Sequence, residues 1–187
     1  MNIFVLDTDP VVAAQLQCDK HVVKMIVESA QMLSTVHRML DGTVERRRSK
    51  SGKMMLKYWA HPDPNMEASL YKAVHTGHPC TVWSLESSAN YYWHLNHFEA
   101  LLNEYEYRYN KKHSSGRLMQ YLLNPPINIP SGGITPFKLA MGSNPECIDN
   151  NDPVGSYRKF YQTKQERFKM AWTARKIPDW FNVMATA

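Results

Sequence analysis

The chain of 187 residues lacks several features that would assign a protein class directly. It has three cysteines, Cys18, Cys80 and Cys147, and their odd number and wide spacing argue against a disulfide framework and for a reducing compartment. No apolar run approaches the roughly 18 residues of a membrane helix, and MNIFVLDTDP lacks the basic flank and apolar length of a signal peptide. We therefore expect a cytoplasmic protein without a membrane partner.

Phosphate loops and common catalytic motifs are missing too. Gly132 and Gly133 form no glycine-rich phosphate loop, and no G-x-S-x-G motif occurs. HTGH (75–78) and HLNH (94–97) each offer one histidine pair, but no array of known zinc spacing appears. The sequence therefore predicts no nucleotide-binding loop, no metal site and no cofactor.

The chain does have positive charge and enough apolar residues for one core. Its net charge is +5, its hydrophobic content is 43% and its aromatic content is 11%. A basic surface attracts polyanions through long-range attraction and counterion release, which favours nucleic acid as a partner. The same charge is also ordinary for a soluble protein of this size. The length predicts a single domain, 1–187, that folds without disulfides or metals.

Helix caps and apolar spacing predict a helical fold. Asp9 followed by Pro10 marks the start of a short helix through VVAAQLQ, Asp19 is placed to cap a second helix reaching about His37, and Asp152 before another proline repeats the signature. The other predicted segments are a strand or extended arm at 2–6, a polar loop at 41–57, a short helix before 79, a helix at 79–113 that breaks near 87–88 or near 97, a helix at 115–123, an irregular crossing at 124–151, a helix at 154–172 and a tail at 173–184. We predict an all-α fold, a compact single-domain helical bundle with long irregular loops.

The loop at 41–57 holds a basic cluster. It comprises Arg46, Arg47, Arg48, Lys50 and Lys53. Such a run is most often a solvated loop, and contact with nucleic acid is the alternative.

The stretch CDKHVVKM (18–25) concentrates titratable groups at the predicted start of the second helix. A helix N-terminus carries partial positive charge, which favours a neutral His21 and a partly deprotonated Lys20. Such tuning suits acid/base or imine chemistry. In the simpler alternative, Asp19 only caps the helix. Lys20, Lys24 and Glu28 then form one solvated face, because they are spaced by four. Val22, Val23, Ile26, Ala30 and Leu33 form the predicted buried stripe.

Three blocks of sequence resemble one family. They are NIFVL…AAQLQCDKHVVKM, with Gln15, Lys20, Val22, Val23 and Lys24 at matching positions, GHPCTVW (77–83), and KIPDWF (176–181). Together they are similar to the phage pyrimidine-dimer DNA glycosylase/AP-lyase family of the endonuclease V type. The resemblance implies a viral origin, and hence the cytoplasm of a host cell.

The family resemblance also implies an activity. Its members are compact and all-α, bind damaged duplex DNA and flip a base. A free α-amine then attacks the sugar carbon and forms an imine that permits strand cleavage, assisted by a glutamate on the second helix. An α-amine suits this role because α-amines titrate about two pH units below lysine side chains.

Two positions depart from the family pattern. The bulk of Asn2 should block removal of Met1, and His21 stands at the acidic position, with Asp19 two residues earlier. Four alternatives follow: Met1 supplies the amine, Lys20 supplies it, Asp19 or His21 activates water in a hydrolytic enzyme, or catalysis has been lost.

We therefore predict a DNA N-glycosylase, with or without AP-lyase activity, that acts as a monomer on duplex DNA with a damaged or modified base. Its predicted catalytic residues are Met1, Asp19, Lys20 and His21. Its predicted substrate-binding residues are Asn2 and Gln15 for the base edge, Lys24, Arg158 and Lys159 for phosphates, His78 at the start of the central helix, and Trp180, which borders the site, stacks on DNA or packs in the core. The alternatives are a non-catalytic basic DNA-binding protein and a nucleoside or nucleotide N-glycosidase.

Overall fold

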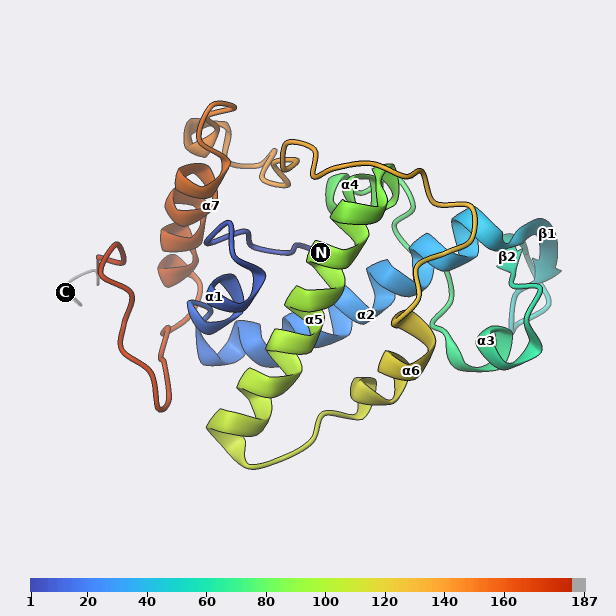
Figure 1. The fold of residues 1–187 in the computed structure, drawn as a ribbon, viewed down its shortest axis with the longest axis horizontal. Coiled ribbons are helices and arrows are strands. Elements are labelled where there is room, and N and C mark those ends of the chain that lie inside the picture. The colour runs from blue at the N-terminus through green and yellow to red at the C-terminus, as the bar shows by residue number, and fades with distance from the viewer. Residues whose placement is uncertain (183–187) are drawn as a thin grey trace.

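The structure, a computed structural model, describes residues 1–182 and is mostly helical (Figure 1). In chain order the elements are α1 (Pro10–Gln15), α2 (Asp19–Asp41), β1 (Thr43–Arg48), β2 (Met55–Ala60), α3 (Pro64–Ser69), α4 (Pro79–Glu86), α5 (Ser88–Tyr109), α6 (Met119–Leu122) and α7 (Pro153–Gln162). Short 3-10 turns lie at Ser114–Leu118, Pro145–Cys147 and Thr163–Glu166. None of the helices in residues 1–182 combines the length and apolar character needed to cross a bilayer.

The predicted start of α1 is confirmed, whereas α2 starts one residue earlier than predicted. The Asp9 carboxylate accepts the N–H groups of Val11 and Val12, and Pro10 is the first helical residue. In α2, Cys18 occupies the cap position without a side-chain bond, and Asp19 is the first residue inside the helix. The prediction that Asp19 caps this helix is therefore wrong.

The long central helix breaks at the first of the two predicted places. The Ser87 side chain accepts the N–H of Asn90 and starts α5 directly after α4 ends at Glu86. The helix ends at Tyr109, before the predicted His113, because Asn110 takes the left-handed conformation with φ of 51°. α2 and α5 therefore form two long helices that cross in the centre of the molecule (Figure 1).

The prediction of a polar loop at 41–57 is wrong, and so is the prediction of a purely all-α fold. β1 and β2 pair antiparallel from Thr43 opposite Ala60 to Arg48 opposite Met55. The hairpin lies beyond the end of α2, at one edge of the molecule (Figure 1). Every residue of β1 is exposed, so no buried face produces the alternation that marks a strand.

The C-terminal helix is shorter than predicted. α7 ends at Gln162 instead of Trp172, and the chain continues through a 3-10 turn into an extended tail. Within the tail Phe181 is buried and Trp180 is half-buried. Residues 183 and 184, the end of the predicted tail, lie outside the described residues.

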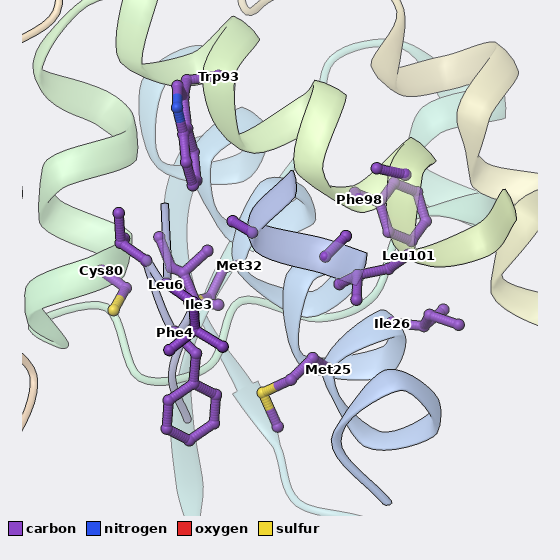
Figure 2. Packing of buried hydrophobic residues seen from close by; sticks show 14 of the residues in the cluster. Ile3, Phe4, Leu6, Met25, Ile26, Met32, Cys80, Trp93, Phe98 and Leu101 are labelled. Carbon is purple, nitrogen blue, oxygen red and sulfur yellow. The ribbon is translucent and has the colours of Figure 1, made fainter. Parts of the chain in front are cut away.

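The first six residues form an extended arm inserted into the core, one of the two forms predicted for 2–6. Ile3, Phe4 and Leu6 are buried, and Figure 2 shows them among side chains of α2, α4 and α5, including Met25, Met32, Cys80 and Trp93. Phe4 has a φ of 51°, which is uncommon for an aromatic residue, and the Leu6 N–H donates to its carbonyl at 2.8 Å. This tight turn fixes the path of the arm across α2.

Candidate active site

The N-terminal amine lies beside a carboxylate of α2. The α-amine nitrogen of Met1 is 3.7 Å from Oε2 of Glu28. The same oxygen accepts the backbone N–H of Asn2 at 2.8 Å, and the other carboxylate oxygen lies 3.3 Å from Nζ of Lys24. The Glu28 side chain is 12% exposed, whereas that of Lys24 is 66% exposed. Glu28 therefore links the amine to a lysine on the surface.

The arm holds the amine in this position. The Asn2 side chain donates to the carbonyl of Ala140 at 3.0 Å and accepts the N–H of Phe4 at 2.9 Å. The side chain of Met1 is 4% exposed while the residue as a whole is half-buried, so most of its exposed surface belongs to the backbone. The amide of Asn2 is buried and engaged within the protein, so this geometry does not suit its predicted role in reading a base.

His78 lies next to the amine. Its Nδ1 accepts the N–H of Cys80 at 3.2 Å and caps α4. Burial lowers the pKa of His78, the nearby α-amine and His75 lower it further, and a hydrogen bond with the Met1 backbone opposes the shift. The ring is therefore neutral at pH 7, with its proton on Nε2. Burial also raises the pKa of the Cys80 thiol to about 11, so this cysteine is no nucleophile.

Lys164 is a second amine that sequence reasoning did not single out. Its Nζ lies 3.3 Å from the centroid of the Phe160 ring. Burial, followed by the charge of Arg167, lowers the pKa of Lys164 to about 8, and Lys24 contributes in the same direction. The sequence predicts a helix that continues past this residue to 172. Because α7 ends early, the residue instead lies in a 3-10 turn and its side chain folds onto the core.

His21 lies in an aromatic cage. Its ring stacks on Phe4 at 4.7 Å and meets the edges of Tyr161 and Phe168. Burial, with the charges of Lys24 and Lys164, lowers the pKa of His21 to about 3. Nδ1 has no hydrogen-bond partner among the described residues. Such an imidazole is a weak base at neutral pH and is shielded from water, so its geometry does not suit the predicted catalytic role.

Asp19 and Lys20 lie at the N-terminal end of α2, more than two turns before Glu28. The Asp19 carboxylate accepts Nη1 of Arg108 at 2.9 Å and the N–H and hydroxyl of Thr173 at 2.9 and 2.8 Å. Burial raises its pKa, but these bonds outweigh burial and hold the pKa below its usual value. Lys20 is exposed, with Nζ 4.5 Å above the Phe168 ring. Both residues line a cavity of about 450 Å³ that also includes Tyr105. Asp19 therefore holds the fold together, and its geometry does not suit acid/base catalysis.

The other predicted binding residues are spread around the arm and α7. Arg158 donates from Nε to the carbonyl of Leu6 at 2.9 Å, and its guanidinium lies 5.5 Å from the Trp180 ring. Lys159 is exposed. Gln15 lines a separate cavity of about 370 Å³ between α1 and α5. The structure thus brings Met1, Asn2, Lys24 and His78 together, and places Gln15, Asp19, Lys20, Arg158, Lys159 and Trp180 elsewhere.

Glu28 is the site residue that sequence reasoning missed. Its spacing from Lys20 and Lys24 was visible, and the family resemblance implied a glutamate on the second helix, but the acidic position was assigned near residue 21. Comparison of the chain with family models, with curated proteins and with solved structures finds no match.

Proposed function

We propose that the protein is a DNA N-glycosylase with AP-lyase activity, in which the α-amine of Met1 is the nucleophile and Glu28 moves the proton. The observation that carries this proposal is the 3.7 Å separation between the amine and the Glu28 carboxylate. This pairing supports the proposal because the family resemblance implies the same two groups, an amine and a glutamate on the second helix.

The chemistry follows from these two groups. Glu28 takes a proton from the ammonium, and the free amine attacks C1′ of the deoxyribose, so that the bond from C1′ to the base breaks and the base leaves with the electron pair. The sugar ring then opens to an imine between C1′ and the amine. Removal of a proton from C2′ expels the 3′ phosphate and cuts the strand. Neutral His78 lies beside the amine, where its bonds to the Cys80 N–H and to the Met1 backbone suit it to position the amine.

A duplex DNA partner is supported by the charge distribution. Lys24 is exposed at the site, and β1 presents Arg46 and Arg48 on an exposed strand, whereas Arg47 pairs with Glu45 and Glu67. Phosphate contacts of this kind hold a duplex without reading its sequence, while the base is flipped toward the site. We propose that the protein acts as a monomer in the cytoplasm.

Borohydride trapping tests the proposal, because reduction attaches an amine nucleophile covalently to DNA. The substrates are duplexes carrying an abasic site, uracil, a hydroxymethylated base or a photodimer. Wild type should form a trapped adduct on at least the abasic duplex. Glu28→Gln, which keeps the acceptor for the Asn2 N–H, and a chain extended by one glycine before Met1 should each lower trapping at least about 100-fold.

Matched controls separate the competing amines. Lys20→Met and Lys164→Met remove the other two candidate nucleophiles and should trap as wild type does. Peptide mapping of the adduct should place the sugar on residue 1. An adduct on Lys20 or Lys164, or retained trapping in the extended chain, would overturn the role of Met1.

A non-catalytic DNA-binding protein is the second candidate, favoured by the exposed basic hairpin. In that case wild type and Glu28→Gln would bind every duplex equally, and neither would release a base or form an adduct.

A further inference from the structure

Three potential metal ligands converge at the far end of α2. His37 and Asp41 lie four residues apart on one face of the last turns of this helix, and His61 directly follows β2. Their ligand atoms all lie within 4.8 Å of one another. His37 and His61 are 2% and 8% exposed. Two imidazoles and a carboxylate are thus gathered in a mostly buried position.

The hydrogen bonds of His37 leave one ring nitrogen without a proton. The Tyr91 hydroxyl donates to the carbonyl of Leu122 at 2.8 Å, so its oxygen accepts from Nε2 of His37 at 2.7 Å. Because Nε2 carries the ring proton, Nδ1 is unprotonated and has a free lone pair. This Nδ1 is buried and has no partner among the described residues. A metal-bound histidine has this arrangement, with its second nitrogen donating to an oxygen that fixes the ring.

His61 and Asp41 complete the set. Nε2 of His61 is likewise buried and unpartnered within residues 1–182, while its Nδ1 accepts the N–H of Asp63 at 3.2 Å. When a metal ion binds Nε2, the ring proton moves to Nδ1. A protonated Nδ1 can no longer accept the Asp63 N–H, so this long hydrogen bond must break. The Asp41 carboxylate accepts the N–H groups of Ile127 and Asn128 at 2.8 and 3.0 Å, which fixes its orientation.

We propose that His37 Nδ1, His61 Nε2 and the Asp41 carboxylate bind a divalent transition-metal ion of the zinc class. Zinc accepts two imidazoles, a carboxylate and a water in tetrahedral geometry, whereas calcium and magnesium prefer oxygen ligands alone. The sequence pattern pointed only to the histidine pairs at 75–78 and 94–97, and it predicted no metal site.

The location indicates what the ion would do. It would join the end of α2 to the end of β2 and, through Asp41, to the segment containing Ile127. The site goes beyond the proposed glycosylase activity, since nine residues of helix, about 13 Å of rise, separate His37 from Glu28. An ion here would therefore stabilise the attachment of the basic hairpin.

Metal titration tests the proposal on chelator-treated full-length protein, with Zn²⁺ measured by calorimetry and Co²⁺ by visible absorption. Wild type should bind one equivalent of either ion, with d–d bands for Co²⁺ and a melting temperature raised by Zn²⁺. His61→Gln and Asp41→Asn should each weaken binding at least about 100-fold and abolish the thermal shift. His75→Gln, which alters an exposed histidine, should bind as wild type does.

Two further variants keep the outcome decisive. Tyr91→Phe removes the oxygen that fixes His37 and should weaken Zn²⁺ binding about 10- to 100-fold. Glu28→Gln should bind Zn²⁺ normally, so failure of the catalytic proposal leaves this one intact. Absence of saturable binding to wild type, or equal binding by wild type and His61→Gln, would overturn the site and leave only a buried water bridging the two rings.

Discussion

Asp19 joins three parts of the chain through its carboxylate. It pairs with Arg108, whose buried side chain also bonds Glu104 at 2.7 Å, and it accepts two hydrogen bonds from Thr173 in the tail. Arg175 closes the network by donating to Glu104 at 2.8 Å. Because Arg108 retains Glu104 when Asp19 is neutralised, no buried charge is left alone. Substitution of Asp19 can therefore test whether this residue is structural or catalytic without leaving an unpaired buried charge.

Asp19→Asn should lower the free energy of unfolding by about 1–3 kcal/mol, the range for charge-assisted hydrogen bonds, without lowering borohydride trapping. Urea unfolding and single-turnover trapping on abasic duplex measure the two effects separately. Glu28→Gln is the matched control, since it should lose trapping while Asp19→Asn keeps it. Loss of trapping by a fully stable Asp19→Asn protein would return Asp19 to the catalytic site.

Residue roles were predictable where they depend on local spacing. The alignment of Lys24 with Glu28 follows from a four-residue interval. The buried stripe of α2 differs slightly from the predicted one, because Val23 is 39% exposed while His21 and Met25 are buried. The proximity of Met1 to Glu28 depends on an arm that turns at Phe4 in a left-handed conformation, and no periodicity in the sequence indicates that turn.

The β1–β2 hairpin is the element best suited to test DNA binding. A cation lies over an aromatic ring on each face of the hairpin: the Arg47 guanidinium lies 3.6 Å from the Tyr58 ring, and Lys57 Nζ lies 4.4 Å from the Trp59 ring on the opposite face. Arg38 fixes its base by donating to the carbonyl of Trp59 at 2.9 Å. A ribbon held this way can present cations to phosphates without bending.

Arg46→Gln with Arg48→Gln should weaken binding to duplex DNA several-fold and lower the slope of log affinity against log salt by about 0.9 for each phosphate that the protein no longer neutralises. Fluorescence anisotropy across a salt series measures both quantities. Lys111→Gln with Lys112→Gln removes equal charge from exposed positions after α5 and serves as the control. An equal effect in both double variants would indicate attraction by net charge alone, and unchanged binding in both would exclude the hairpin from the DNA interface.

Elements were predictable where caps or an apolar stripe mark them. Asp9 with Pro10 and Asp152 with Pro153 both start helices as predicted. The hairpin was missed because β1 has no buried face, so its stability comes from pairing with β2 and from hydrogen bonds that Arg38 makes to distant parts of the chain. The early end of α7 was missed because its polar face continues past Gln162 in sequence although the helix does not.

At the scale of the whole molecule, buried histidines make the fold sensitive to acid. Burial lowers the pKa of His21 and His94 to about 3 and that of His37 and His97 to about 4. Each histidine titrates near 6.5 in the unfolded chain, so the unfolded state binds more protons at every pH between these values. The free energy of unfolding should therefore be highest above pH 6.5 and fall as the pH decreases toward 4.

Urea unfolding of chelator-treated protein at pH 7.5 and 5.5 should show a loss of about 5 kcal/mol, because each of the four histidines contributes up to about 1.4 kcal/mol per pH unit below 6.5. His21→Phe tests one group, since phenylalanine suits the cage formed by Phe4, Tyr161 and Phe168. This variant should lose about 1.4 kcal/mol less than wild type over the same interval. His75→Gln, at an exposed position, should keep the wild-type difference, and an unchanged difference in His21→Phe would show that His21 takes up its proton without unfolding the protein.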